Sequence, residues 1–249
     1  ALEDGLEARS AASAVNGSQG TTRSVLARVT APLERMAQRL ETIAGLCEGD
    51  EALLGAHLEG PFLSVGHRGA HDPALLQDPA PEAVARLLDA GHGHIAQVTL
   101  APERDGALEA IGQFVQAGVR VAVGHTTAGY EEASAAFDRG ATSLTHAFNG
   151  MEDMLHRKPG PPPAAVEHTG VTVELICDGV HVSEPAMQVL MRAVRGRIAL
   201  IPDAIAAAGS TDGSYLLGAV AVVAVGGAAR PPERGSIEGP PLLSHADFR

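Results

Sequence analysis

The sequence predicts an α/β fold and, within that class, a TIM-like (β/α)8 barrel. Short β-rich runs alternate with helix-like segments along most of the chain, and such alternation produces a parallel sheet covered by helices. Polar residues follow these runs nearly every time. In a closed barrel those strand ends converge on one rim, whereas an open, doubly wound sheet would spread them along an edge. The chain also has no G-x-G-x-x-G turn or P-loop, which favours the barrel over the doubly wound sheet.

Seven segments are predicted to be buried strands because they are short, apolar and followed by polar or turn-forming residues. They are Thr22–Val29, Leu53–Leu58, Ile95–Leu100, Val119–Val123, Ser143–Thr145, Val171–Ile176 and Ile198–Ile201. The predicted helices between them include Pro32–Leu46, Pro81–Ala90, Ala107–Ala117, Glu131–Arg139 and Glu184–Val194. Ser183 is expected to cap the last of these helices, with Pro185 in its first turn. Seven βα units are one fewer than a closed barrel needs, so we expect its first strand to be absent from this chain.

The chain is expected to divide at residue 212. Residues 20–212 form the predicted catalytic barrel, and residues 213–249 form a C-terminal segment. Within that segment, Tyr215–Arg230 is rich in Val, Ala and Gly and is expected to supply strands of a small accessory β-sandwich. Residues 1–19 are rich in Ala, Ser and Gly and show little pattern.

Composition excludes several classes of partner. The net charge of -12 argues against nucleic acid or an anionic membrane as a binding partner. No apolar run is long enough to span a bilayer, and no signal peptide begins the sequence. Two cysteines, Cys47 and Cys177, make no disulfide framework and fit a reducing compartment. We therefore expect a cytoplasmic protein.

The stretch GAHLEGPF, residues 55–62, ends a predicted strand with a histidine and a carboxylate. His57 and Glu59 are two positions apart, so both side chains fall on the same face of the strand. Gly60 and Pro61 then stop the strand. This arrangement leaves the Glu59 carboxylate at the mouth of the sheet, where it could be a metal ligand or an ordinary residue in a turn.

Two histidines follow later strands and complete a candidate metal site. Glu59, His125 and His146 would give one carboxylate and two imidazoles, and three protein ligands with an open fourth position are typical of catalytic zinc. A metal in such a site lowers the pKa of a bound water to about 7. Asp203, after the last predicted strand, would accept the proton of that water. A histidine taken singly is more often structural or solvated, so the residue pattern alone leaves the metal site open.

Six stretches together carry a resemblance to a known family: GAHLEGPF, GAHDP, VGHTTAGYEEASAAFDRGATSLTHAFNGM, HRKPG, ICDGVHV and PDAIAAAG. From about Gly20 to Ser236 the chain resembles the N-acetylglucosamine-6-phosphate deacetylases of the amidohydrolase superfamily. The combination of H-L-E-G-P-F with G-H-T and T-H-x-F-N is specific, whereas no single stretch would suffice. The resemblance implies a hydrolase of amino-sugar metabolism that releases acetate from N-acetylglucosamine 6-phosphate and leaves glucosamine 6-phosphate.

The resemblance also implies catalytic roles. Glu59, His125 and His146 match the family's metal ligands, and Asp203 matches its catalytic aspartate. His71 of GAHDP matches a histidine that contacts the acetamide carbonyl of the substrate. The implied cofactor is a divalent metal ion, with zinc expected and one or two ions per subunit.

Four further residues match substrate-binding positions of the family. Asn149 and Gly150 lie where backbone and side chain meet the phosphate, and Arg157 of HRKPG is similar to a phosphate-binding arginine. Lys158, the single lysine of the chain, adds a second cation beside it. His181 of DGVHV matches a histidine that contacts the sugar, often across a dimer interface, so the resemblance implies a homodimer that binds a small phosphorylated amino sugar.

The chain departs from the family pattern at both ends. The family normally begins with β-sandwich strands and a first barrel strand ending in H-x-H or a substituted form of it, and this chain starts after that point. PDA also replaces the more usual T-D-A. Two alternatives to the deacetylase therefore remain open. The chain could be an amidohydrolase for a different N-acyl sugar or cyclic amide, or a degenerate homologue that binds a sugar phosphate without catalysis.

Overall fold

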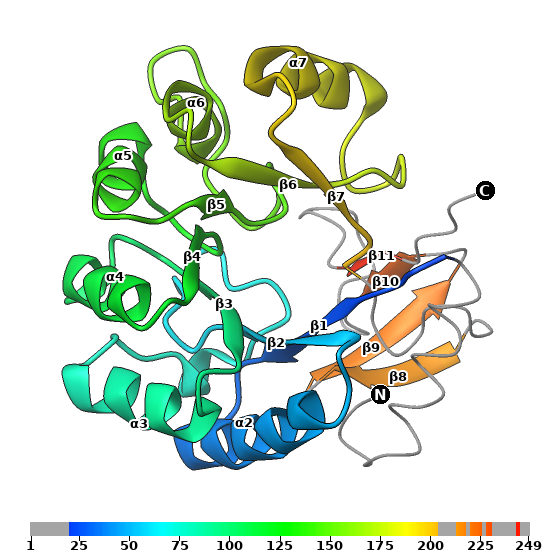
Figure 1. Cartoon of the computed structure of the whole chain (residues 1–249). Helices are drawn as coiled ribbons and strands as arrows, with labels where there is room; N and C mark the ends of the chain where they lie inside the picture. Colours follow the sequence, from blue (N-terminus) through cyan, green and yellow to red (C-terminus); the bar gives the residue numbers. More distant parts are fainter. Residues whose placement is uncertain (1–19, 204–212, 218–219, 226–227, 231–242, 245–249) are drawn as a thin grey trace.

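A parallel β-sheet, curled into an arc, organises the protein. The computed structural model describes residues 20–203, 213–217, 220–225, 228–230 and 243–244, so the predicted segment 1–19 lies outside the described residues. The seven strands of the arc follow one another in chain order, from β1 to β7. Each neighbouring pair is parallel, and helices cover the outside of the arc (Figure 1).

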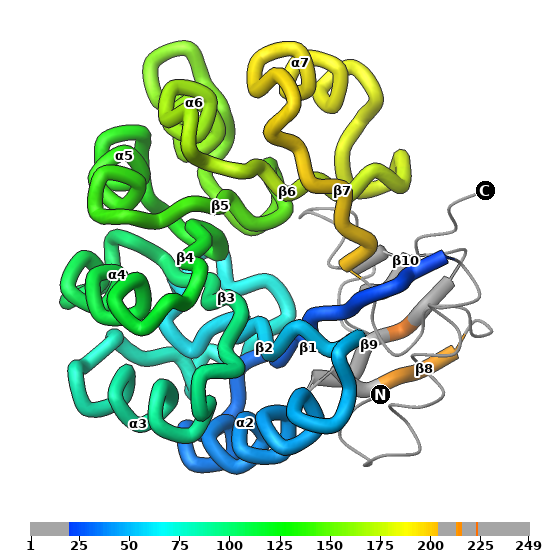
Figure 2. Tube along the Cα trace, in the orientation of Figure 1, coloured from blue at the N-terminus to red at the C-terminus, as the bar shows by residue number. Residues whose placement is uncertain are grey.

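All seven predicted strands are present, with ends that differ from the prediction by two residues at most. They are β1 (Ser24–Val29), β2 (Leu53–Glu59), β3 (Ile95–Leu100), β4 (Arg120–Val123), β5 (Ser143–Leu144), β6 (Thr172–Ile176) and β7 (Ile198–Ile201). The Cα trace passes once around the arc from β1 to β7 (Figure 2). Because the strands are parallel, their carboxyl ends all lie at the same rim.

The connections between the strands are mainly helical. The helices are α2 (Leu33–Glu48), α3 (Pro81–Gly91), α4 (Ala107–Gln116), α5 (Tyr130–Asp138), α6 (Pro161–Glu167) and α7 (Glu184–Val194), with a 3-10 turn, η2 (Pro73–Leu75), after β2. Ser183 does precede α7, and Pro185 lies in its first turn, but the Ser183 side chain makes no capping hydrogen bond. The predicted helix start and the N-cap position of Ser183 are therefore confirmed, although the serine does not cap through its side chain.

Helix α6 was not among the predicted helices because its sequence, PPPAAVE, begins with three prolines. Prolines are tolerated in the first turn of a helix, where backbone N–H groups have no intrahelical acceptor in any case. Pro161 and Pro162 are buried there. This proline cluster is thus the start of the helix between β5 and β6.

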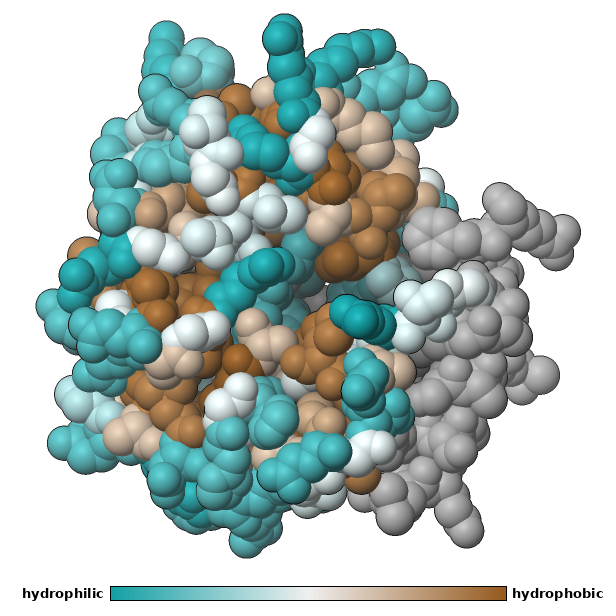
Figure 3. All heavy atoms as spheres, in the orientation of Figure 1, coloured by the Kyte–Doolittle hydropathy of each residue, from teal (hydrophilic) through white to brown (hydrophobic). Residues whose placement is uncertain are grey.

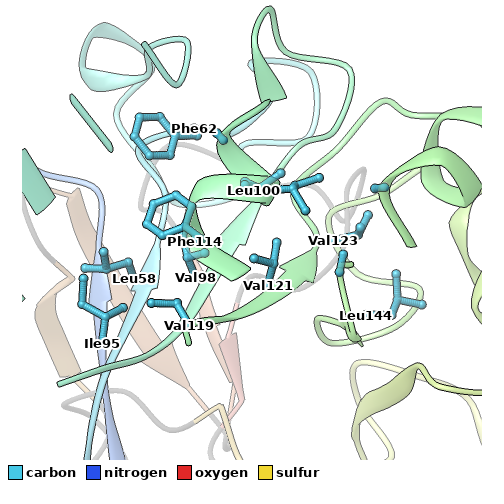
Figure 4. Packing of buried hydrophobic residues seen from close by; sticks show 14 of the residues in the cluster. Leu58, Phe62, Ile95, Val98, Leu100, Phe114, Val119, Val121, Val123 and Leu144 are labelled. Atoms are coloured by element: carbon cyan, nitrogen blue, oxygen red, sulfur yellow. The ribbon is translucent and has the colours of Figure 1, made fainter. Parts of the chain in front are cut away.

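The main hydrophobic core lies between the sheet and its helices. Leu58 of β2 and Val98 and Leu100 of β3 are fully buried, and Figure 4 shows them beside Phe114 of α4. Side chains alternate between the two faces of a strand. With Leu58 facing the helices, His57 and Glu59 point to the concave side of the arc, on the same face as predicted.

The arc contains seven strands in the described residues, rather than the eight of a closed (β/α)8 barrel. The edge strands β1 and β7 face each other across the open side of the arc (Figure 1). The observed fold is therefore an α/β fold with a curled, seven-stranded parallel sheet, consistent with an incomplete TIM-like barrel.

A second sheet follows the arc in the chain. It is antiparallel, in the order β11-β10-β9-β8, and its strands are β8 (Gly213–Leu217), β9 (Val220–Val225), β10 (Ala228–Arg230) and β11 (Leu243–Ser244). On the face shown in Figure 3, hydrophilic residues cover much of the outer surface of the helices, and hydrophobic residues gather further in. None of the helices in the described part of the chain is long and apolar enough to cross a membrane.

Candidate metal centre and active site

Three predicted site residues converge at the carboxyl ends of β2, β4 and β5. Glu59 is the last residue of β2, and its Oε1 lies 2.9 Å from Nε2 of His125 and 3.2 Å from Nε2 of His146. The two Nε2 atoms are 3.1 Å apart. All three side chains are buried. The structure therefore brings together the carboxylate and the two imidazoles that the sequence suggested as metal ligands.

Hydrogen bonds on the far side of each ring fix which nitrogen carries a proton. Nδ1 of His125 lies 2.8 Å from the carbonyl of His67, and Nδ1 of His146 lies 3.1 Å from the carbonyl of Asn149. A carbonyl only accepts, so each Nδ1–H donates to it. In the neutral rings this leaves both Nε2 lone pairs directed at the Glu59 oxygen. Three electron-rich atoms within 3.2 Å of one another, each backed by an outer hydrogen bond, fit a shared divalent cation.

Without a cation, a proton holds this cluster together. Hydrogen bonds from His125 and His146 overcome the effect of burial and keep the pKa of Glu59 well below its usual value. Burial acts to lower the pKa of His146, but the adjoining Glu59 carboxylate, with the charges of Asp203 and Glu174, raises that pKa to about 9. Protons and a metal ion should therefore compete for this site.

The backbone is unusual at the same strand ends. His125 and His146 have φ values of 49° and 28°, and Asp203 has a φ of 47°. Left-handed backbone is uncommon for residues other than glycine, and such positions concentrate at functional sites. Next to them, Gly150 has a φ of 57°, and a Cβ at this position would lie 2.9 Å from Nδ1 of His125. Glycine thus lets the chain pass close behind the His125 ring.

His71 lies beside this cluster, in the loop after β2. Its Nε2 is 3.9 Å from Oε2 of Glu59, and its ring meets the ring of His125 edge-on at 4.9 Å between centroids. Ligand atoms of Glu59, His71 and His125 all lie within 4.8 Å of one another, so His71 belongs to the group of side chains that could hold a metal. Burial lowers the pKa of His71 to about 3, and the nearby His125 adds to this effect.

Asp203 follows β7 and interacts electrostatically with Glu59, His125 and His146. Burial, followed by the negative charge of Glu59, raises the pKa of Asp203 above its usual value, and the neighbouring histidines only partly offset this. A carboxyl group whose pKa is raised is better matched to exchanging a proton near neutral pH. The position and environment of Asp203 are thus those of a candidate acid–base group.

His181 is held in a fixed orientation by Asp178. Its Nδ1 lies 2.7 Å from Oδ2 of Asp178, and the two side chains are 2% and 4% exposed. Oδ1 of Asp178 also accepts hydrogen bonds from the backbone N–H groups of Val180 and His181. Nε2 of His181 is buried without a hydrogen-bond partner in the described residues. A buried polar atom of this kind needs a partner, and a bound ligand could supply it.

Asn149 also presents an unpaired polar atom. Its Nδ2 donates to the carbonyls of His146 and Ala147, and its Oδ1 is buried with no hydrogen-bond partner in the part of the chain that is described. The free atom is an acceptor, so it suits a hydroxyl or N–H donor of a ligand.

Arg157 stands apart from the cluster. It is exposed in a tight turn closed by reciprocal backbone hydrogen bonds between Leu155 and Lys158. No hydrogen bond or ion pair of Arg157 is present among the described residues. The guanidinium is therefore available to an anion, although the structure does not bring it into contact with Glu59, His125 or His146.

Sequence reasoning missed a polar network inside the arc. Nε2 of Gln97 donates to Oε1 of Glu174 at 2.8 Å, and Nε2 of His57 lies 2.7 Å from the hydroxyl of Thr99. The Thr99 hydroxyl in turn lies 2.8 Å from that of Thr145. Burial raises the pKa of Glu174 and lowers that of His57 to about 4. The sequence signal for this network was Glu174, a charged residue in the middle of the otherwise apolar predicted strand Val171–Ile176.

Comparison with known proteins places this site in a family. No protein-family model matches the chain. The chain is 40% identical over 210 residues to an N-acetylgalactosamine-6-phosphate deacetylase of Escherichia coli O157:H7, covering 83% of this chain and 56% of that protein. It is 37% identical over 203 residues to an N-acetylglucosamine-6-phosphate deacetylase of Vibrio furnissii, covering 80% of this chain and 51% of that protein. The chain thus spans about half the length of these curated relatives.

Solved structures agree with the sequence comparison. A mutant N-acetyl-D-glucosamine-6-phosphate deacetylase from Mycobacterium smegmatis, in complex with N-acetyl-D-glucosamine-6-phosphate, matches with a TM-score of 0.87 and 44% identity. The match covers 91% of this chain and 58% of that one. An N-acetylglucosamine-6-phosphate deacetylase from Thermotoga maritima matches with a TM-score of 0.83 and 29% identity, covering 92% and 61% of the two chains. These similarities in sequence and fold show that the chain belongs to the N-acetylglucosamine-6-phosphate deacetylase family of amidohydrolases.

Proposed function

We propose that this chain carries the active site of a metal-dependent deacetylase that converts N-acetylglucosamine 6-phosphate to glucosamine 6-phosphate and acetate. The observation that carries the proposal is the convergence of Glu59, His125 and His146, with the outer nitrogen of each imidazole bonded to a backbone carbonyl. Binding of a sugar phosphate alone would not require this arrangement. The names of the relatives, which include deacetylases of both N-acetylglucosamine and N-acetylgalactosamine phosphates, support the same reaction class.

The proposed ligands of the metal are Glu59, His125 and His146, and zinc suits this donor set. A divalent cation held there would supply Lewis acidity toward both a water molecule and the acetamide carbonyl. The carboxylate and the two backbone-tethered imidazoles keep their ligand atoms within 3.2 Å of one another. One ion accounts for these three ligands, and whether a second ion binds is part of the test.

Asp203 and His71 are proposed to act on the substrate. An acetamide is a poor electrophile, and its amine is a poor leaving group until it is protonated. We assign to the Asp203 carboxylate the removal of a proton from the attacking water and its return to the leaving nitrogen. His71, neutral because of its burial, would donate a hydrogen bond from Nε2 to the carbonyl oxygen as negative charge develops there.

The remaining residues are proposed to hold the sugar phosphate. The free acceptor atoms, Oδ1 of Asn149 and Nε2 of His181, suit sugar hydroxyl groups, with the backbone around Gly150 nearby. The exposed Arg157, next to Lys158, suits the phosphate, because a guanidinium binds phosphate oxygens through parallel N–H donors. In a chain of net charge -12, this local pair of cations would be needed to attract an anionic substrate.

We further infer the organisation of the complete protein. The seven-stranded arc, within residues 20–212, would belong to a closed (β/α)8 barrel, and strands from residues 213–249 to an accessory β-sandwich. A homodimer is the proposed assembly. Support for the closed barrel comes from the similarity to relatives of which this chain spans about half and from β1 and β7, which are the edge strands of the arc among the described residues. The homodimer rests on the family resemblance alone.

The decisive experiment is acetate release from N-acetylglucosamine 6-phosphate by the purified, metal-stripped chain, before and after zinc is added. Activity that depends on added metal would support the proposal. Tight binding of the sugar phosphate without acetate release would instead indicate a degenerate, non-catalytic homologue. Absence of both binding and release, with zinc bound, would contradict the substrate assignment.

A second candidate substrate is N-acetylgalactosamine 6-phosphate, favoured by the 40% identity to the Escherichia coli deacetylase of that sugar. The two sugars differ only in the configuration of one hydroxyl group, so the same centre could serve either. The ratio of kcat/KM for the two phosphates separates them. A ratio above about ten in favour of the galactose epimer, equivalent to about 1.4 kcal/mol, would replace the first assignment.

A further inference from the structure

Thr30, which follows β1, contacts two residues of the candidate active site. It is 6% exposed, and its hydroxyl lies 3.2 Å from the carbonyl of Glu59 and 2.8 Å from Nδ1 of His71. Its backbone N–H also donates to Nδ1 of His71 at 3.3 Å. A single residue directly after the first strand thus connects the end of β2 with the loop that carries His71.

The contact with the backbone determines the tautomer of His71. A backbone N–H can only donate, so Nδ1 of His71 must present its lone pair. In a neutral imidazole the proton is then on Nε2. The opposite tautomer would place an Nδ1–H against the Thr30 N–H and lose this hydrogen bond. The single proton of the Thr30 hydroxyl can be donated either to this lone pair, at 2.8 Å, or to the carbonyl of Glu59, at 3.2 Å, and it reinforces the preference in the first case.

This tautomer separates His71 from the proposed metal ligands. Nε2 of His71 lies 3.9 Å from Oε2 of Glu59, on the side of the ring that faces the cluster. A nitrogen that carries a proton donates a hydrogen bond and cannot coordinate a cation. His125 and His146 have the opposite tautomer when they are neutral. Their Nδ1–H groups donate to carbonyls, so their Nε2 atoms carry the lone pair that can coordinate a cation.

Gly60 makes room for the Thr30 hydroxyl. A Cβ at residue 60 would lie 2.2 Å from Oγ1 of Thr30, and the residue has a φ of 90° that favours glycine. The glycine of the HLEGPF stretch therefore does more than end the strand. It allows the side chain from β1 to lie between the carbonyl of Glu59 and the ring of His71.

From this geometry we propose that Thr30 is a positioning residue that holds His71 as the Nε2–H tautomer, so that His71 donates a hydrogen bond into the active site instead of binding the metal. The role in carbonyl polarisation rests on the function proposed above. The assignment of the tautomer does not rest on that function, because it follows from the hydrogen bond between the backbone N–H of Thr30 and Nδ1 of His71.

Nuclear magnetic resonance tests the tautomer without any need for activity. A long-range proton–nitrogen correlation spectrum of the zinc-loaded chain, labelled at histidine nitrogen, distinguishes protonated from unprotonated ring nitrogens, and His71→Asn identifies the His71 signals. We expect an unprotonated Nδ1 and a protonated Nε2 in the unmodified chain. A protonated Nδ1, or a zinc-bound Nε2, would overturn the proposal.

Kinetics tests whether Thr30 acts through His71. Thr30→Val keeps the backbone N–H that sets the tautomer and removes the hydroxyl that helps to orient the ring of His71. It should therefore lower kcat for acetate release by ~10-fold with KM little changed, while Thr30→Ser should restore kcat. In a His71→Asn background, Thr30→Val should cause no further loss. Thr42→Val is the matched control. It removes an exposed helix hydroxyl that donates to the carbonyl of Gln38, and it should change neither kcat nor KM.

The two kinds of failure are distinguishable. An equal loss from Thr30→Val in both backgrounds would show that Thr30 acts independently of His71 and would contradict the positioning role. If the unmodified chain releases no acetate with any metal, the proposed function fails, and the nitrogen spectrum still decides the tautomer. Zinc content of His71→Asn equal to that of the unmodified chain supports the assignment of His71 as a donor, and its loss would contradict it.

Discussion

The Nε2 atoms of His125 and His146 lie 3.1 Å apart, and each ring is tied through Nδ1 to a backbone carbonyl behind it. Two imidazole lone pairs at this distance repel each other unless a cation or a proton lies between them and the Glu59 carboxylate. The outer hydrogen bonds prevent either ring from escaping by changing tautomer. The cluster is therefore built to hold a positive charge.

Removal of the Glu59 carboxylate should abolish tight metal binding. Glu59→Gln keeps the shape of the side chain but replaces the anionic ligand with a weak neutral one, and we expect zinc affinity to fall on the order of 100-fold or more. Zinc titration followed by calorimetry measures the change. Glu109→Gln, on the exposed face of α4, is the control and should bind zinc like the unmodified chain. Zinc binding by Glu59→Gln at full affinity would exclude this cluster as the metal site.

Asp203 should be needed for turnover and not for metal binding. Asp203→Asn removes the acid–base group while preserving its size, and a general base typically contributes about 100- to 10,000-fold in rate. We expect kcat to fall by that order, with zinc content and KM nearly unchanged. The measurement is acetate release beside a zinc assay of the same preparation. Turnover at the rate of the unmodified chain would refute the proposed proton transfer.

Much of this site could be predicted because a parallel sheet places the carboxyl ends of its strands at one rim. Glu59 and His146 are 87 residues apart in the chain, yet both directly follow an apolar run that was recognisable as a strand. The positions of His125 and Asp203 follow from the same rule. Once the alternation of strands and helices was identified, sequence position after a strand was enough to bring these residues together.

Residues whose importance depends on distances across the arc could not be predicted. Gln97 and Glu174 are 77 residues apart and meet only because β3 and β6 face each other across the concave side. Thr30 ends an ordinary strand and carries no motif of its own. Its contact with His71 depends on the path of the loop after β2, which local sequence does not specify.

Arg157 should set substrate affinity for phosphorylated sugars without affecting the fold. Its side chain is exposed, so Arg157→Ala should change the free energy of unfolding by less than about 0.5 kcal/mol. A charge-assisted hydrogen bond contributes about 1.5–3 kcal/mol, so KM for the sugar phosphate should rise by roughly 10- to 100-fold. KM for the unphosphorylated sugar should change little.

The control for this experiment is Arg35→Ala, because Arg35 is also exposed, on α2, and its substitution removes the same net charge. It should leave both KM values unchanged. Equal effects of Arg157→Ala on phosphorylated and unphosphorylated substrates would contradict the assignment of Arg157 to the phosphate, whatever its effect on overall activity.

The stability of the metal-stripped chain should be greatest near pH 6.5 if the buried histidines dominate its pH dependence. The pKa of His146 is raised from 6.5 to about 9, so the folded chain binds this proton more tightly than the unfolded chain does. Its contribution to stability is complete below pH 6.5 and disappears as the pH rises through 9. The pKa values of His57 and His71 are lowered to about 4 and about 3. These two rings favour folding only while they are neutral, so their contribution is lost as the pH falls below 6.5.

Zinc should reverse the alkaline part of this profile. The metal replaces the proton shared by His146 and Glu59, so its stabilising effect should grow between pH 6.5 and 9, where proton competition weakens. Urea unfolding at pH 5, 6.5, 8 and 9, with a chelator and with excess zinc, measures both effects. His146→Asn should flatten the alkaline slope of the chelated chain and remove the zinc effect together. If both the alkaline slope and the zinc effect persist in His146→Asn, then the cluster of Glu59, His125 and His146 is not the site that binds the proton and the metal ion.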